Sequence, residues 1–266
     1  MKIGFIGAGN MATAIIGGLL GAEVNPADIF VFDMDAAKLE SFRAKGISVQ
    51  PDSPSVTKNC DIIVLAVKPQ NYSEVLAEIA SSAEMTKTFV SIAAGITIDF
   101  VRRGLSLDCP VVRVMPNTPL LVGKGATALC FSDGVGEEVK EVVTSMFSST
   151  GVTRVFTEDK MDAIISVNGS SPAYFYLFAK AMADYAESVG IDRQNAMDLI
   201  CAAMEGSAEM LRTSGDGPDT LIKKVSSKGG TTIEALNVFY ENNLENTIKE
   251  AMAACTKRAG ELAAEA

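Results

Sequence analysis

Short apolar runs alternate with helical patterns over the first part of the chain. The runs are rich in β-branched and aromatic residues, as strands are, and the stretches between them repeat their apolar positions every three to four residues. Ile62–Val67 shows no alternation of apolar and polar positions, as expected for a strand covered on both faces. Strands that alternate with helices predict βαβ units and a largely parallel sheet. The expected strands are Lys2–Ile6, Ile29–Phe32, Ile62–Val67, Phe89–Ile92, Val111–Met115, Ala126–Cys130 and Val152–Phe156, and the expected helices include Ala12–Leu20, Ala36–Ala44 and Glu137–Phe147.

The pattern changes after Thr157, where the strand-like runs stop and helical periodicity continues. We therefore predict an α/β protein with an N-terminal Rossmann-type dinucleotide-binding domain over residues 1–157 and an all-helical C-terminal domain over residues 158–266. The later helices carry broad apolar faces that suit either an internal core or a dimer interface. One such face comprises Ala181, Met182, Tyr185 and Val189.

Size and charge narrow the class of protein. With 266 residues, of which 48% are hydrophobic and 21% charged, the chain has the composition of an ordinary soluble protein. A net charge of −10 without a long run of Lys or Arg argues against nucleic acid and anionic membrane as partners. We expect an anionic substrate to be gathered by local backbone dipoles instead.

Cysteine and histidine usage excludes several chemistries. The five cysteines are odd in number and have no metal-binding spacing, which predicts buried thiols in a reducing compartment, no metal site and a cytoplasmic location. The chain has no histidine, so a Ser-His-Asp triad and a histidine-ligated zinc are excluded. The chemistry must need little help with proton transfer, or use Lys, Tyr, Asp or Glu.

A glycine-rich turn directly follows the first predicted strand. The spacing in Gly7–Ala12 matches the dinucleotide-binding fingerprint. Gly7 permits a tight turn, Gly9 lets the backbone approach a pyrophosphate, and Ala12 lets the helix lie close to the strand. The alternative is a turn with a purely structural role, and the position at the start of a βαβ pattern favours cofactor binding.

An acidic residue ends the second predicted strand. The Asp33 carboxylate can accept hydrogen bonds from ribose hydroxyls and would repel a 2′-phosphate. The nearest basic residue downstream is Lys38. We therefore expect NADH to be preferred, with NADPH possible. The alternative makes Asp33 or Asp35 only the N-cap of the next helix.

A second glycine-bearing stretch lies near the C-terminus. Ser226–Thr232 is polar, contains paired glycines and opens into a helix with apolar periodicity. The N–H groups at such a helix start, together with the helix dipole, suit a small carboxylate. Alternatively, Thr231 as N-cap and Glu234 form a capping box. That would explain the threonine and the glutamate but not the serines and glycines before them.

Six motifs occur together along the chain. They are Gly4–Met11, Leu65–Pro69, Ala93–Gly95, Met115–Pro119, Gly169–Tyr174 and Val225–Thr232. Together they resemble the pyrroline-5-carboxylate reductase family, which reduces 1-pyrroline-5-carboxylate to L-proline in the last step of proline synthesis. The resemblance spans nearly the whole chain, and its last two motifs are the most specific.

The resemblance implies a Rossmann domain and a helical domain that interlocks two subunits, in a homodimer or a larger homo-oligomer built from dimers. Each active site would lie between the nucleotide domain of one subunit and helices of its partner. The implied ligands are NADH or NADPH and a small cyclic imino acid. Reduction of a C=N bond fits a chain without histidine, because a protonated imine accepts hydride without a strong general acid.

The resemblance also assigns residues to the site. Ser227 and the N–H groups of Gly230 and Thr231 are expected to hold the substrate carboxylate, and the Thr232 hydroxyl to face the ring nitrogen as the catalytic group. The substrate-binding set is Ser226, Ser227, Gly229, Gly230, Thr231 and Thr232. The cofactor-binding set is Ile6, Gly7, Ala8, Gly9, Asn10, Met11, Asp33, Ala66, Val67, Lys68, Pro69, Ala93, Ala94, Gly95, Met115 and Asn117.

The chain departs from the family pattern at two places. Asn168 and Ser171 stand where the family usually has serine and glycine, near the start of the first long helix, and Asp33 stands where many relatives have a pattern suited to a 2′-phosphate. A 3-hydroxyacid or 6-phosphogluconate-type dehydrogenase, or another imine dehydrogenase, would share the architecture, although Lys180 lacks the glycine-rich context of the catalytic lysine in the hydroxyacid enzymes. The non-enzymatic alternative is a nucleotide-binding relative without turnover.

Overall fold

The computed structural model describes residues 1–265 of the chain, with side chains through Ala263, and Ala266 lies outside the described residues. The chain packs into two compact units: residues 1–172 with the segment from Ala253 onward, and residues 173–252. This division does not follow the change of pattern after residue 157, because residues 158–172 pack with the strands of the sheet.

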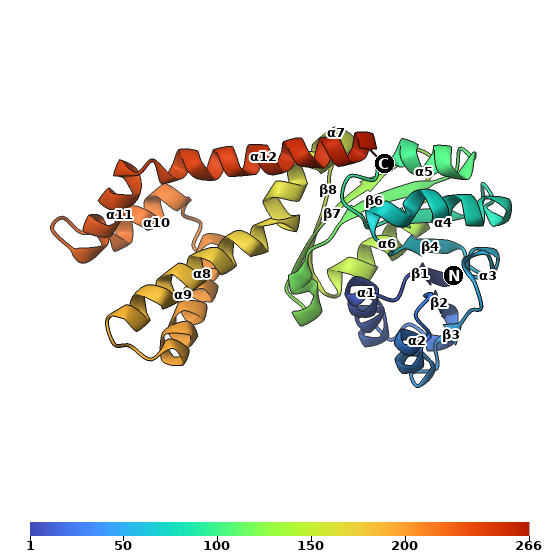
Figure 1. The fold of residues 1–266 in the computed structure, drawn as a ribbon, viewed down its shortest axis with the longest axis horizontal. Coiled ribbons are helices and arrows are strands. Elements are labelled where there is room, and N and C mark those ends of the chain that lie inside the picture. Colours follow the sequence, from blue (N-terminus) through green and yellow to red (C-terminus); the bar gives the residue numbers. More distant parts are fainter. Residues whose placement is uncertain (266) are drawn as a thin grey trace. The chain divides into compact units, whose positions relative to one another are not determined.

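One sheet organises the first unit (Figure 1). In the described residues it has eight strands in the order β3-β2-β1-β4-β5-β6-β7-β8. The strands from β1 to β6 are parallel, β7 runs antiparallel to β6, and β8 is parallel to β7. Their bounds are β1 (Ile3–Ile6), β2 (Ile29–Phe32), β3 (Ser48–Val49), β4 (Ile62–Leu65), β5 (Thr88–Ser91), β6 (Val111–Met115), β7 (Gly125–Phe131) and β8 (Gly151–Val155). The strand order changes direction between β1 and β4, where doubly wound sheets bind dinucleotides, and the predicted α/β class is confirmed.

Helices cover both faces of this sheet (Figure 1). They are α1 (Asn10–Gly21), α2 (Ala36–Arg43), α3 (Ser53–Asn59), α4 (Tyr72–Ile79), α5 (Ile98–Leu105), α6 (Glu137–Ser148) and α7 (Glu158–Ile164). The central strand β4 alternates between two cores: Ile62 and Val64 join side chains of α1 and α6, whereas Ile63 and Leu65 join side chains of α4 and α5. Both faces are therefore apolar, which explains the unbroken hydrophobic run.

The second unit is helical. The helices that follow α7 are α8 (Ser171–Ser188), α9 (Arg193–Thr213), α10 (Pro218–Val225), α11 (Thr231–Glu241) and α12 (Leu244–Glu265). Its buried cluster is small and contains Ala179, Ala183 and Ile200. Met182 and Tyr185 are exposed, so the apolar face to which they belong is not the core of the subunit.

The seven predicted strands are present within two residues at each end. The sequence did not predict β3, because Ser48–Val49 is only two residues long and has no apolar run. Within the described chain, no helix is both long and apolar enough to cross a membrane.

Candidate active site

The glycine-rich turn joins β1 to α1 at the carboxyl edge of the sheet. Gly7 has a φ of +104°, and a Cβ there would lie 2.5 Å from the carbonyl oxygen of Ala66. The Gly7 N–H donates to the Phe32 carbonyl at 2.8 Å, and the Ala66 N–H donates to the Ile6 carbonyl at 2.8 Å. The turn is thus wedged between the ends of β2 and β4, where only glycine fits.

The first turn of α1 follows at once. Gly9 is the N-cap, and α1 begins at Asn10 and Met11. The N–H groups of a first helical turn have no intrahelical acceptors, and with the helix dipole they form an anion site suited to a pyrophosphate. Ala12 is buried against the sheet, so a small side chain there lets the helix approach the strand.

Asp33 connects this turn to the end of β2. One carboxylate oxygen accepts the Ala8 N–H at 2.7 Å, and the other accepts the Asp35 N–H at 2.9 Å and lies 3.3 Å from the Lys38 ammonium. Burial alone would raise the pKa of Asp33, but the two N–H groups and Lys38 outweigh it and hold the pKa below its ordinary value of 3.8. Asp35, not Asp33, is the N-cap of α2, accepting the Ala37 N–H.

Much of the predicted cofactor set lines one hollow of about 540 Å³. The members that line it are Ile6, Gly7, Gly9, Asp33, Ala66, Val67 and Lys68. The lining also includes Ser53, Glu74 and Glu78, and the Ser53 hydroxyl donates to Glu78 at 3.0 Å. The sequence alone does not indicate these residues, because they enter the hollow only through the packing of α3 against α4. Pro69 begins a short 3₁₀ turn after Lys68.

A buried tyrosine braces the neighbouring strand ends. The Tyr72 hydroxyl donates to the Leu65 carbonyl at 2.7 Å and accepts from the Ser91 hydroxyl at 3.1 Å. Burial raises its pKa, so the hydroxyl stays protonated. Tyr72 therefore ties the segment after β4, which holds Val67 and Lys68, to the segment Ala93–Gly95 after β5. No motif in the sequence indicates this role of Tyr72.

The segment after β5 is also held by the end of α12. Gly95 has a φ of +78°, and a Cβ there would lie 3.1 Å from the Leu262 Cβ and 3.4 Å from the Ala259 carbonyl oxygen. Ala93 is buried and Ala94 half-buried. The predicted nicotinamide segment thus has a fixed backbone at the carboxyl end of β5.

Met115 and Asn117 follow β6 at the same edge. The Asn117 side chain is buried, accepts the Ala126 N–H at 2.9 Å and donates to the Asn168 carbonyl at 3.1 Å. Both of its polar atoms are therefore occupied within the protein. Met115 is half-buried beside it.

The predicted substrate loop lies in the second unit, between α10 and α11. Gly229 has a φ of +75°, the Gly230 N–H donates to the Ser227 carbonyl at 3.0 Å, and the Ser226 hydroxyl donates to the Ile222 carbonyl. Gly230 is the N-cap of α11, and Thr231 is its first residue. The capping-box alternative, which needs Thr231 as N-cap, is therefore wrong.

This geometry changes which groups can hold an anion. The Gly230 N–H, expected to face a carboxylate, is already paired with Ser227. Thr231 and Thr232 are exposed at the start of α11, where their N–H groups have no partner one turn back.

Comparison with known proteins places the whole chain in one family. It is 39% identical to the pyrroline-5-carboxylate reductase of Escherichia coli (strain K12) over 98% of both chains. The chain belongs to the pyrroline-5-carboxylate reductase family. Residues 158–262 match the family model for pyrroline-5-carboxylate reductase dimerisation, and residues 2–95 match the model described as NADP oxidoreductase, coenzyme F420-dependent.

Solved structures of this reductase family share the fold. A pyrroline-5-carboxylate reductase from Coxiella burnetii superimposes with a TM-score of 0.90 at 33% identity, covering 98% of both chains. The pyrroline carboxylate reductase of Plasmodium falciparum, solved with NADP bound, gives a TM-score of 0.89 at 28% identity over 99% of this chain and 98% of that one.

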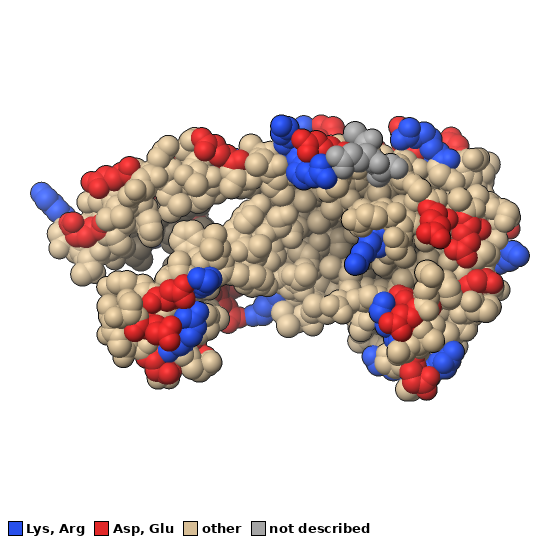
Figure 2. Space-filling model, in the orientation of Figure 1, with Lys and Arg blue, Asp and Glu red and all other residues tan. Residues whose placement is uncertain are grey.

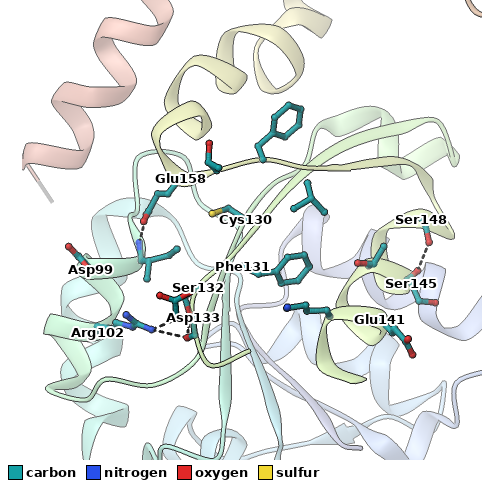
Figure 3. A pocket seen from close by; sticks show the side chains of 16 residues that line it. Asp99, Arg102, Cys130, Phe131, Ser132, Asp133, Glu141, Ser145, Ser148 and Glu158 are labelled. Carbon is teal, nitrogen blue, oxygen red and sulfur yellow. Dashed lines mark hydrogen bonds between the residues drawn. The ribbon is translucent and has the colours of Figure 1, made fainter. Parts of the chain in front are cut away.

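A larger hollow of about 920 Å³ lies elsewhere on the reductase fold (Figure 3). It is beside the carboxyl end of β7, which runs antiparallel to β6 and so ends at the edge of the sheet opposite the glycine-rich turn. Arg102 there donates to the Ser132 hydroxyl at 3.2 Å, and Glu158 accepts the Ile98 N–H at 2.7 Å. These two side chains are thus engaged within the protein, away from the predicted site.

Charge and cysteine positions complete the description. On the face drawn in Figure 2, charged side chains form small separate groups, some of them mixed and some acidic only. Among the side chains that the structure describes, residues 1–263, Cys, Asp and Glu form no group of three or more that could hold a metal ion. Burial raises the pKa of the Cys130 thiol to about 11 and that of Cys60 to about 12. Cys201 is exposed, so the expectation that all the cysteines are buried is wrong at that position.

Proposed function

We propose that this chain reduces 1-pyrroline-5-carboxylate to L-proline by hydride transfer from a nicotinamide cofactor. The observation that carries the proposal is its similarity, over 98% of both chains, to a pyrroline-5-carboxylate reductase. Support also comes from the hollow beside the glycine-rich turn and from the exposed helix start at Thr231, which would supply the two anion sites that the reaction needs. Neither a hydroxyacid dehydrogenase nor a non-catalytic relative is favoured by a comparable observation.

The cofactor, when bound, supplies the hydride. The first turn of α1 would hold its pyrophosphate, because Gly9 leaves the backbone N–H groups open to an anion. Asp33 would accept a ribose hydroxyl at the rim of the hollow. The segments around Val67, Ala93 and Met115 would line the nicotinamide end.

The start of α11 would hold the substrate. Its carboxylate would accept the N–H groups of Thr231 and Thr232, aided by the helix dipole and by the hydroxyl of Ser227. The Thr232 hydroxyl would accept or donate a hydrogen bond at the ring nitrogen. The other predicted members of the loop, Ser226 and Gly229, would shape the turn that presents these groups.

This arrangement suits an imine because little proton chemistry is required. The C=N carbon gains the hydride, the π electrons become the nitrogen lone pair, and that nitrogen carries the proton that the imine brought from solvent. The protein contributes orientation, which supplies roughly 7–11 kcal/mol in well-aligned reactions. A chain without histidine can therefore perform it.

We further propose NADH as the preferred cofactor, from Asp33, with NADPH as a second substrate. Asp33→Ala should lower the ratio of kcat/KM with NADH to kcat/KM with NADPH about tenfold or more, because the Asp33 carboxylate would repel a 2′-phosphate. Asp28→Ala, at the other end of β2, is the matched control. An unaltered ratio of kcat/KM values would refute this role of Asp33.

The assembly that we propose is a homodimer, or a larger homo-oligomer built from dimers, in which a partner subunit completes each site. The support is the match of residues 158–262 to a dimerisation model and the exposed apolar face of α8. The cytoplasmic location inferred from the sequence stays a prediction.

One assay tests the function. The purified protein is incubated with NADH or NADPH and either pyrroline-5-carboxylate or a 3-oxoacid, and cofactor oxidation is followed by the loss of absorbance of the reduced nicotinamide ring. Oxidation with the imine alone supports the proposal. Oxidation with the 3-oxoacid alone would favour a hydroxyacid dehydrogenase, and no oxidation with either would favour a non-catalytic relative.

A further inference from the structure

Asn168 lies in the wide helical turn Ile165–Gly169, which joins α7 to α8. Its side-chain amide donates to two main-chain carbonyls, that of Met115 at 2.7 Å and that of Ala126 at 2.9 Å. Its own main-chain carbonyl accepts from the Asn117 amide at 3.1 Å. One asparagine thus holds the end of β6 and the start of β7 together, and a second asparagine ties both to the turn.

The same turn also packs against the Met115 side chain. A Cβ on Gly169 would lie 2.3 Å from the Met115 Cε, so this thioether lies directly against the glycine backbone. Met115 is therefore fixed twice, through its carbonyl by Asn168 and through its side chain by Gly169.

Only the N–H groups of the Asn168 side-chain amide form hydrogen bonds. It is 9% exposed, and in the described part of the chain its Oδ1 is buried without a hydrogen-bond partner. Leaving a buried oxygen unpaired is unfavourable, whereas both amide hydrogens are well placed. The direction of the amide follows from the donors, since the reversed amide would set an oxygen against two carbonyls.

We propose that Asn168 is a positioning residue for hydride transfer. Through the Met115 carbonyl and Asn117, it fixes the wall at the end of β6 against which the nicotinamide ring lies. This inference rests on the proposed function, which places Met115 and Asn117 at the nicotinamide end. Serine at this position would offer a single donor on a shorter side chain and could hold only one of the two carbonyls.

The test compares Asn168→Ala and Asn168→Ser with the wild-type protein. We expect Asn168→Ala to lower kcat for imine reduction about tenfold or more and to weaken NADH binding severalfold, because a misplaced ring loses near-attack geometry. The deuterium isotope effect with NADH labelled at C4 should rise, as hydride transfer becomes more rate-limiting. Asn168→Ser should give values of kcat, NADH affinity and isotope effect between those of Asn168→Ala and the wild type. The control is Asn25→Ala, which removes an amide bonded to the Ala27 N–H at the opposite edge of the sheet.

The outcomes separate this inference from the proposed function. If the wild type oxidises NADH with the imine and both variants keep its kcat and isotope effect, Asn168 has no positioning role. A merely structural role would lower the melting temperature but leave the isotope effect of the folded enzyme unchanged, and that result overturns the inference too. If Asn168→Ala does not fold, the kcat and isotope effect of Asn168→Ser provide the test. If the wild type is inactive, the proposed function fails. In that case, NADH affinity is measured by fluorescence titration, and an equal affinity in Asn168→Ala and the wild type would contradict the role of Asn168 as well.

Discussion

At the scale of single residues, Asp33 has a structural role in addition to the one proposed for it in cofactor choice. It accepts N–H groups from Ala8 and Asp35, so it holds the glycine-rich turn to the end of β2, and its pKa lies below 3.8 as a result. A group with a lowered pKa in the folded state stabilises the protein above its unfolded pKa, and this contribution is lost as the pH falls through the folded value.

Asp33→Asn should therefore destabilise the protein at pH 7, and the difference from the wild type should shrink as the pH falls below about 4. The amide can still accept a hydrogen bond but carries no charge to face Lys38 and the N–H groups. Urea unfolding at pH 7 and at steps down to pH 3 measures this. A difference that does not change with pH would mean that the charge of Asp33 contributes nothing to folding.

Thr232 is the residue on which catalysis should depend most directly. Thr232→Val keeps the shape of the side chain but loses the hydroxyl, so kcat should fall about tenfold to a hundredfold if that group holds a charged or developing centre. NADH affinity should change little, because the cofactor is proposed to bind at the other glycine turn. Thr220→Val, at an exposed threonine near the start of α10, is the control. Equal turnover in the Thr232 variant and the wild type would remove Thr232 from the site.

At the scale of elements, the strands and the nucleotide turn could be predicted because their signals are local. The apolar run Ile62–Val67 and the spacing of Gly7 and Gly9 depend on neighbours in sequence alone. The parts that escaped prediction depend on distant contacts. Tyr72 is an ordinary apolar position until its hydroxyl meets the end of β4, and Glu78 enters the nucleotide hollow only because α4 packs beside α3.

The position of α7 also depends on contacts that are distant in sequence and could not be predicted. Arg113 on β6 is 3% exposed, and its guanidinium lies 2.5 Å from Asp162 and 3.7 Å from Glu158, both on α7. A charged residue within an apolar strand gives no indication of its partner until the fold is known. This pairing explains why residues 158–172 pack with the sheet instead of the later helices.

Removing the Asp162 carboxylate should show how much the stability of the fold depends on this ion pair. Asp162→Ala leaves Arg113 buried without its closest carboxylate and should destabilise the protein by about 2–3 kcal/mol, less than the full value for a buried pair because the Asp162 side chain is 32% exposed. Asp159→Ala, on the same helix but paired with Lys160 at the surface, should have a much smaller effect. Urea unfolding of both variants provides the comparison, and equal destabilisation would show that the Arg113 pair contributes nothing beyond a surface contact.

At the scale of the whole molecule, the second unit exposes many large apolar side chains. A hollow of about 720 Å³ on it is lined by apolar side chains that include Leu177, Tyr185, Leu199 and Phe239. Leu199 is 72% exposed. Contiguous apolar patches on soluble proteins mark interfaces, and this one lies within the region that matches a dimerisation model. The sequence showed the apolar face but could not say whether it was a core, because helical periodicity is the same in both cases.

Leu199→Glu should therefore shift the protein from a dimer or larger oligomer towards monomers, because a carboxylate would be buried in the interface without a partner. Since a partner subunit is proposed to complete each site, kcat/KM should fall in parallel with dissociation, and raising the protein concentration should restore part of it. Light scattering after size-exclusion chromatography measures the mass at each concentration. Met85→Glu is the control, because Met85 is 63% exposed in the first unit and the variant carries the same new charge. A Leu199 variant that keeps both the wild-type mass and the wild-type activity would place the interface on another face of the helical unit.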